Sequence, residues 1–126
     1  MSIRKCIALL PVEDLDATVA FYRDALGFAL HSSHEESGEM EWCRLKSGTA
    51  EVMFYNPLAV GDAPAELLDR GRVILYMVTD DLARQRERLS EAGHEVSPIR
   101  ATFYGLDEFD VTDPAGYTIT FGQRSA

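Results

Sequence analysis

The sequence has 126 residues, of which 46% are hydrophobic and 26% charged, as is typical of one globular domain with a buried core. A formal net charge of −9 excludes the basic surface that nucleic acids and anionic membranes attract. No run reaches the roughly 20 apolar residues of a membrane span, and Pro11 interrupts the N-terminal apolar run too early for a signal peptide. Cys6 and Cys43 lie far apart without metal-ligand spacing, which favours a reducing compartment. We therefore expect a cytoplasmic protein without nucleic-acid or membrane partners.

The first structured segment begins with an apolar run at residues 9–12, short enough for a β-strand. Asp14 stands where a helix N-cap is expected, and apolar residues then recur at helical spacing. Gly27 follows the last of them, and glycine commonly ends helices. The sequence thus predicts a helix between Asp14 and Gly27. Strand-like runs follow it at residues 30–33, 41–45 and 51–55.

The same pattern returns in the second half of the chain, 66 residues later. Val12, Asp14 and Gly27 are matched there by Val78, Asp80 and Gly93, and either Asp80 or Asp81 can cap the second helix. Strand-like runs again follow, at residues 95–99, 108–112 and 117–121. Two tandem βαβββ units are the simplest interpretation, because internal repetition outweighs other fold signals. An ordinary α+β domain with two unrelated helices is the alternative.

We predict a single α+β domain over residues 1–126, with its repeats side by side. The first repeat covers about 3–56, a linker covers 57–71, and the second repeat covers about 72–123. Such a pair forms an incompletely closed barrel with the helices outside. The concave interior is then the expected ligand cleft.

Two segments carry a family resemblance: VEDLDATVAFYRDALGF in the first half and YGLDEFDVTDPAGYTITFGQ in the second. Together they resemble the vicinal oxygen chelate superfamily, which includes glyoxalase I, extradiol dioxygenases, and the fosfomycin and bleomycin resistance proteins. The resemblance spans residues 7–123 and implies a homodimer with clefts at its interface. Because this fold serves many chemistries, the function has to be argued from the site residues.

The resemblance also implies where the enzymes of this family hold a divalent metal, with two ligands from each repeat. The corresponding positions carry three aliphatic residues and one hydroxyl: Ile7, Val52, Val73 and Thr120. None is a good ligand, since divalent metals need several imidazole, carboxylate or thiolate groups. A register shift of one residue would replace Val52 by Glu51 and Ile7 by Cys6, and the set would still be incomplete. We therefore expect no metal and no other cofactor.

A second resemblance concerns the ligand. Residues 104–109, YGLDEF, resemble the W-G-x-R-E-F segment of the bleomycin resistance group, with Tyr104 in place of the tryptophan and Asp107 in place of the arginine. Strand alternation places Glu108 and Asp110 on the cleft face, where they could meet a cation. The residues between and after them, Phe109 and Val111, are then expected in the core.

The predicted ligand site combines aromatic and acidic side chains. Phe54 shares strand parity with Val52 and is expected to face the cleft, whereas the facing of Trp42 stays open. Aromatic faces with carboxylates nearby suit a planar or cationic compound. The predicted ligand-binding residues are Trp42, Phe54, Phe103, Tyr104, Glu108 and Asp110.

The leading hypothesis is a non-catalytic binding protein that sequesters a planar aromatic or cationic compound in a dimer-interface cleft, as in antibiotic resistance. The alternative is a divergent glyoxalase-like or dioxygenase-like metalloenzyme with unorthodox ligands, or acid–base catalysis by Glu108 and Asp110. A small-molecule sensor or storage protein is a third possibility.

Overall fold

The computed structural model describes residues 3–36, 38–57 and 73–126. Contacts divide the chain into two units, Met1–Asp69 and Arg70–Ala126, each with its own sheet and helix. The predicted linker at 57–71 lies outside the described residues except for Pro57. Neither helix of the described ranges has the length and apolar content needed to cross a membrane.

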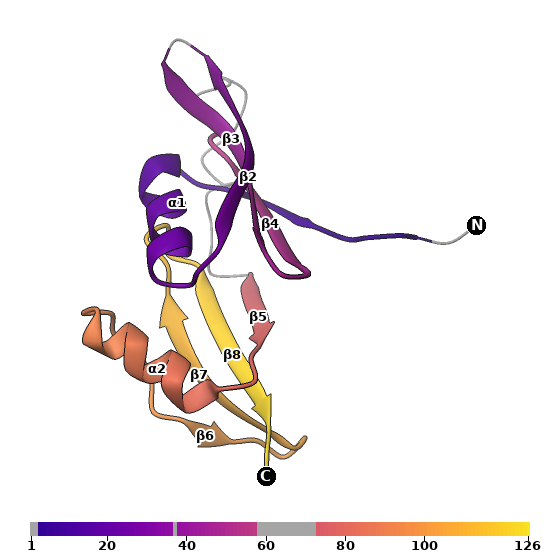
Figure 1. Cartoon of the computed structure of the whole chain (residues 1–126), viewed down its shortest axis with the longest axis vertical. Helices are drawn as coiled ribbons and strands as arrows, with labels where there is room; N and C mark the ends of the chain where they lie inside the picture. The colour runs from indigo at the N-terminus through magenta and orange to yellow at the C-terminus, as the bar shows by residue number, and fades with distance from the viewer. Residues whose placement is uncertain (1–2, 37, 58–72) are drawn as a thin grey trace. The chain divides into compact units, whose positions relative to one another are not determined.

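The first unit contains one helix and four strands in the order β-α-β-β-β. Its elements are β1 (Ala8–Pro11), α1 (Leu15–Asp24), β2 (Ala29–Glu36), β3 (Glu39–Ser47) and β4 (Ala50–Tyr55). The sheet order is β1-β4-β3-β2, with β1 parallel to β4 and the other neighbours antiparallel. Helix α1 packs on one face of this sheet (Figure 1), where the ring of Tyr22 lies 5.0 Å from that of Phe54 and 5.7 Å from that of Phe28.

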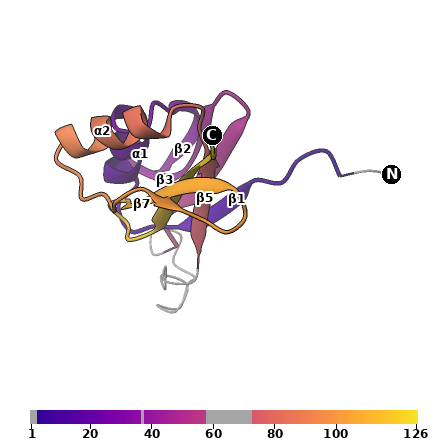
Figure 2. The ribbon, with the colours of Figure 1, turned by 90° about the horizontal axis from the view of Figure 1, so that it is seen from below.

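The second unit repeats this topology. Its elements are β5 (Ile74–Val78), α2 (Leu82–Glu91), β6 (Arg100–Ala101), β7 (Leu106–Thr112) and β8 (Thr118–Arg124), and the sheet order is β5-β8-β7-β6. Helix α2 contacts β7 and β8 (Figure 2), and Phe109 stacks on Phe121 with the ring centroids 5.2 Å apart. The prediction of two tandem βαβββ units is confirmed.

Both helices begin with an aspartate cap, but the caps differ from a simple 66-residue repeat. Asp14 Oδ1 accepts a hydrogen bond from the Ala17 N–H at 3.0 Å, whereas the cap of α2 is Asp81, which accepts from the Arg84 N–H at 3.3 Å. Asp14 and Asp81 are 67 residues apart, while the glycines after the helices keep the predicted offset of 66. Both helices have 10 residues, so the segment from the end of the helix to the following glycine is one residue shorter after α2 than after α1.

One predicted strand is wrong. Residues 95–99 form no strand, and Val96 makes only an isolated bridge with Val111. Pro98 lacks a backbone N–H and so cannot complete a ladder there. The strand at this edge is instead the two-residue β6, which pairs with Asp107 and Glu108 of β7.

Candidate binding site

One face of the second sheet brings together side chains from β5, β7 and β8. Strand register places Tyr76 and Asp110 beside Thr120, and Glu108 beside Gly122, and directly paired residues point to the same side. We define the open face of the second sheet as Tyr76, Glu108, Asp110, Thr118, Thr120 and Gly122. The alternating residues, which include Phe109 and Val111, are buried with the apolar core. Phe109 and Val111 therefore lie in the core, as predicted.

Glu108 is the centre of a hydrogen-bonded network on this face. Its side chain is only 4% exposed, yet its carboxylate accepts three hydrogen bonds. Tyr76 and Tyr104 donate to Oε2 at 2.7 Å and 2.5 Å, and Arg100 Nη2 donates to Oε1 at 3.0 Å. The bond from Tyr104, together with those from Tyr76 and Arg100, lowers the pKa of Glu108 despite its burial. Glu108 is therefore an ionised carboxylate held in one orientation.

Asp110 shares the same guanidinium group. Arg100 Nη1 and Nη2 donate to its two oxygens at 2.9 Å and 3.1 Å, and Thr120 Oγ1 donates at 2.7 Å. The hydrogen bonds from Arg100 lower the pKa of Asp110. We predicted that Glu108 and Asp110 would meet a cation. In the structure the cation that they meet is Arg100 of the same chain.

Tyr76 crosses the sheet directly over Gly122. A Cβ atom at position 122 would lie 2.0 Å from Tyr76 Oη and 2.6 Å from its Cζ, far inside van der Waals contact. Only glycine therefore permits this ring position, as expected where a strand glycine marks a close approach. Burial of the Tyr76 hydroxyl, reinforced by its hydrogen bond to Glu108, raises the pKa of Tyr76 to about 12.

The loop between β6 and β7 presents two aromatic rings. Phe103 is 99% exposed and Tyr104 is 53% exposed, and their ring centroids lie 5.0 Å apart with the planes nearly perpendicular. The Tyr104 hydroxyl also donates a hydrogen bond to the buried carboxylate of Glu108, which holds the Tyr104 ring in place. An exposed aromatic pair held in this way suits a stacking partner.

The two predicted site residues of the first unit have opposite facings. Phe54 is fully buried against Tyr22 on the side of the sheet that α1 covers, so the predicted cleft-facing orientation is wrong. Trp42 is half-buried and lies directly opposite Tyr55. Pairing and alternation along β3 and β4 place Trp42 on the side away from α1. We define the open face of the first sheet as Trp42, Arg44, Lys46, Glu51, Met53 and Tyr55.

The positions that the family resemblance assigns to metal ligands do not fit a metal here. Val52 is buried on the α1 side, and Glu51 takes the outward position that the one-residue register shift anticipated. Val73 precedes β5, and Ile74 is the residue that shares a face with Thr118 and Thr120. Across the described ranges, no group of three His, Cys, Asp or Glu side chains is placed to hold a metal ion.

Glu51 is instead surrounded by cations. Its side chain is 4% exposed and forms ion pairs with Lys5 and Arg44, with Arg44 Nε at 2.8 Å from Oε1. Lys46 Nζ lies 4.0 Å from the same oxygen. The hydrogen bonds from Lys5 and from Arg44 lower the pKa of Glu51 to about 2.

This lowered pKa predicts a specific acid sensitivity. A carboxyl group with a depressed folded-state pKa stabilises the fold above its ordinary pKa of 4.5, and that contribution is lost as the pH falls towards about 2. We expect the free energy of unfolding to decrease over this window, and to decrease less in Glu51→Gln. Urea denaturation between pH 6 and pH 2 measures both slopes. Glu95→Gln, an exposed control, should keep the wild-type slope; equal slopes for Glu51→Gln and the wild type would refute the expectation.

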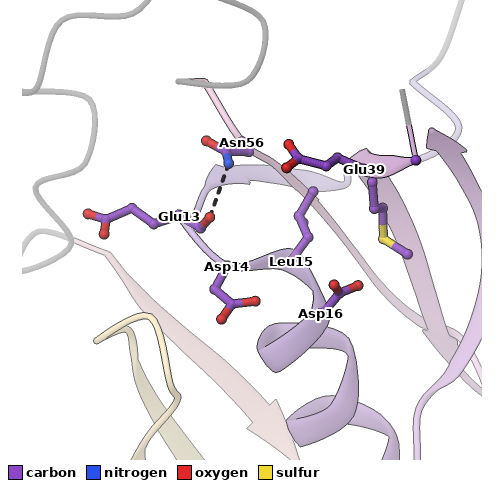
Figure 3. A pocket seen from close by; sticks show the side chains of 8 residues that line it. Glu13, Asp14, Leu15, Asp16, Glu39 and Asn56 are labelled. Atoms are coloured by element: carbon purple, nitrogen blue, oxygen red, sulfur yellow. Dashed lines mark hydrogen bonds between the residues drawn. The ribbon is translucent and has the colours of Figure 1, made fainter. Parts of the chain in front are cut away.

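A separate cavity of about 340 Å³ lies beside the start of α1 (Figure 3). Asn56 closes part of it by donating a hydrogen bond to the Glu13 carbonyl at 3.0 Å, and Asp14 is engaged as the helix cap. Among the described residues, no aromatic side chain and none of the predicted site residues lines it. Its acidic lining therefore does not suit the aromatic ligand predicted from the sequence. The lining residues are Glu13, Asp14, Leu15, Asp16, Gly38, Glu39, Met40 and Asn56.

Sequence reasoning missed Tyr76, Arg100 and the cation cluster at Glu51 as site components, and it gave Gly122 no role. Two signals were available. Tyr76 is the one hydroxyl-bearing residue in the otherwise apolar β5, with the parity of Thr120, and Gly122 interrupts a strand. The convergence on Glu51 had no local signal, because Lys5 is 46 residues away in the sequence.

Solved structures of similar fold include binding proteins and an enzyme. TnmS3, an antibiotic binding protein from Streptomyces sp. CB03234, is 23% identical, with 99% of each chain covered and a TM-score of 0.78. A bleomycin-binding protein complexed with bleomycin is 19% identical, with 98% of this chain and 100% of that chain covered and a TM-score of 0.70. Lactoylglutathione lyase from Agrobacterium tumefaciens is 21% identical, with 95% and 92% covered and a TM-score of 0.72. At these identities the likeness concerns the fold.

The family assignment comes from the sequence. A comparison with curated proteins gives no match. Residues 6–121, which include both repeats, match the family described as Glyoxalase/Bleomycin resistance protein/Dioxygenase superfamily. The chain therefore belongs to the Glyoxalase/Bleomycin resistance protein/Dioxygenase superfamily.

Proposed function

We propose that this protein is a non-catalytic binding protein that sequesters a planar aromatic compound, in the manner of an antibiotic resistance protein. The observation that carries the proposal is the exposed aromatic pair Phe103 and Tyr104, tied through the Tyr104 hydroxyl to the buried carboxylate of Glu108. Preorganised aromatic surface of this kind favours stacking, because little conformational freedom is lost when a ligand binds.

The state of the polar groups supports binding rather than catalysis. Glu108 and Asp110 are both paired with Arg100 and have lowered pKa values, so neither is suited to donate a proton near neutral pH. Burial raises the pKa of the Cys43 thiol to about 11, which leaves it protonated and a poor nucleophile. The same pairing with Arg100 favours an aromatic ligand over the cationic one considered from the sequence.

The proposal extends to the assembly and the compartment. TnmS3 and the bleomycin-binding protein share the fold and bind antibiotics, which supports a small-molecule role here. We propose that the two units form one domain and that two copies form a cytoplasmic homodimer with the ligand cleft at its interface. Exposed apolar side chains on β5, Ile74 and Val78, support association, and light scattering of the purified protein tests it.

Replacement of Phe103 tests the proposed site. We expect Phe103→Ala to weaken binding of the best aromatic ligand about tenfold, because a stacked ring contributes about 1.4 kcal/mol. The melting temperature should not change, since Phe103 is 99% exposed and contributes little to the core. A thermal-shift screen of planar aromatic antibiotics, with bleomycin included, identifies the ligand, and isothermal titration calorimetry gives the affinities.

Two further variants give this test its controls. Phe103→Trp should retain binding, and Ile99→Ala, another exposed apolar position in the same unit, should bind like the wild type. Absence of binding by any aromatic compound would refute the proposal. Elemental analysis of protein purified without chelator separates the enzyme alternative: one equivalent of a transition metal per chain would favour a metalloenzyme.

A further inference from the structure

The open face of the first sheet carries an excess of positive charge in an acidic protein. The chain has a formal net charge of −9 and contains two lysines, Lys5 and Lys46. Both lie within 4.0 Å of Glu51, and Arg44 is the third cation on the same carboxylate. Three cations against one carboxylate leave a local charge of about +2.

Glu51 does not use the full binding capacity of these cations. Arg44 binds Glu51 through Nε and Nη2, which both donate to Oε1, and Nη1 is not among these donors. Lys46 Nζ, at 4.0 Å from Oε1, lies beyond hydrogen-bonding distance. Their side chains are 24% and 35% exposed, so solvent reaches both. Glu51 thus orients the cations and leaves donors available to a second anion.

An aromatic surface adjoins this cluster on the same face. Trp42, Arg44 and Lys46 occupy every second position of β3, so each lies about 7 Å along the strand from the next. Tyr55 lies directly opposite Trp42, and both rings are half-buried. The step from Trp42 to Arg44 is short enough for one small ligand to contact both side chains.

We propose that the open face of the first sheet binds an aromatic acid, with the ring on Trp42 and Tyr55 and the carboxylate between Arg44 and Lys46. The inference rests on the proposed function in one respect, namely that the protein binds aromatic compounds. It concerns a different surface from the pair Phe103 and Tyr104, and it specifies an acidic ligand for that surface. Arg44 gives a planar pair of donors for a carboxylate, and Lys46 adds a point charge. Lys5 and Glu51 hold the arrangement in place.

Three probes with the same ring and different charge test the inference: 2-naphthoate, 2-naphthamide and 2-naphthylmethylammonium. In isothermal titration calorimetry at low ionic strength we expect 2-naphthoate to bind at least tenfold more tightly than 2-naphthamide, and the ammonium compound to bind most weakly. Lys46→Gln should weaken 2-naphthoate about tenfold and leave 2-naphthamide unchanged. Arg84→Gln, which removes the same charge from an exposed position on α2, should change neither.

Two variants distinguish a loss of ligand affinity from a loss of folding. Lys46 makes no hydrogen bond to Glu51, so Lys46→Gln should keep the wild-type circular dichroism and melting temperature. Trp42→Leu should weaken 2-naphthoate and 2-naphthamide equally, because it removes the ring and not the charge. Equal affinity of 2-naphthoate and 2-naphthamide, or tighter binding of the ammonium compound, would overturn the inference and leave the proposed function intact. If bleomycin or a planar aromatic antibiotic binds but 2-naphthoate does not, the inference also fails alone. If no aromatic compound binds, both the inference and the proposed function are refuted.

Discussion

Gly122→Ala is expected to break the Tyr76–Glu108 hydrogen bond and to lower the free energy of unfolding by about 1–2 kcal/mol. The added Cβ would lie 2.0 Å from Tyr76 Oη, so the ring has to leave its place over β8. Loss of a hydrogen bond to a charged group costs about 1.5–3 kcal/mol. Reduced freedom of the unfolded chain offsets about 0.4–1 kcal/mol of this cost, which leaves the expected net loss of about 1–2 kcal/mol. Urea denaturation gives the value.

A double-mutant cycle assigns this effect to Tyr76. Tyr76→Phe should cost about 1 kcal/mol in the wild type and almost nothing in the Gly122→Ala background, where the hydroxyl is already displaced. Alkaline absorbance titration offers a second readout, because the pKa of Tyr76 should fall from about 12 towards the ordinary value of 10 in Gly122→Ala. Additive costs, or an unchanged tyrosine titration, would show that Gly122 does not fix Tyr76.

Glu108→Gln should have a larger effect, a loss of about 2–3 kcal/mol. Glu108 accepts hydrogen bonds at both carboxylate oxygens, two from tyrosines and one from Arg100. A glutamine amide has only one oxygen, so its NH₂ group must face either the tyrosine hydroxyls or the guanidinium group. The side chain is 4% exposed, and water therefore cannot replace the lost partners. Urea denaturation at pH 7 measures the loss.

The difference in stability between the wild type and Glu108→Gln should depend on pH. Because the pKa of Glu108 is lowered in the folded protein, the wild type should lose its advantage over Glu108→Gln as the pH falls below the ordinary value of 4.5. Glu95→Gln, at an exposed position, is the matched control, and it should leave the free energy of unfolding unchanged both at pH 7 and below pH 4.5. A Glu108→Gln variant as stable as the wild type at pH 7 would mean that the network does not depend on the carboxylate.

The helices and the repeat can be predicted from sequence because their signals are local. Asp14 and Gly27 limit the first helix within a few residues, and a cap or a helix-ending glycine acts through its own backbone neighbourhood. Such patterns do not show that the two helix caps are 67 residues apart while the two helix-ending glycines are 66 apart. Asp80 and Asp81 both satisfy the capping rule, and only the structure selects Asp81.

The facing of β4 shows where counting fails. The metal position at Val52 follows from the family resemblance, and a register difference of one residue reverses the facing of every side chain in the strand. Phe54 consequently lies in the core, and Glu51 takes the outward position.

The candidate site could be predicted only in part for a related reason. Tyr104, Glu108 and Asp110 lie within one short segment, so their association is local. Tyr76 comes from another strand, 32 residues before Glu108, and its contact depends on the register between β5, β8 and β7. Arg100 likewise reaches Glu108 through the pairing of β6 with β7.

The position of the two lysines has a practical consequence for how this protein can be handled. No other side chain in the sequence carries a primary amine, so reagents such as succinimidyl esters can react only at Lys5, Lys46 and the α-amino group. Coupling through either lysine would thus attach a dye or a sensor chip beside Glu51, on the surface whose affinity is to be measured. Attachment through a carboxy-terminal tag avoids that artefact.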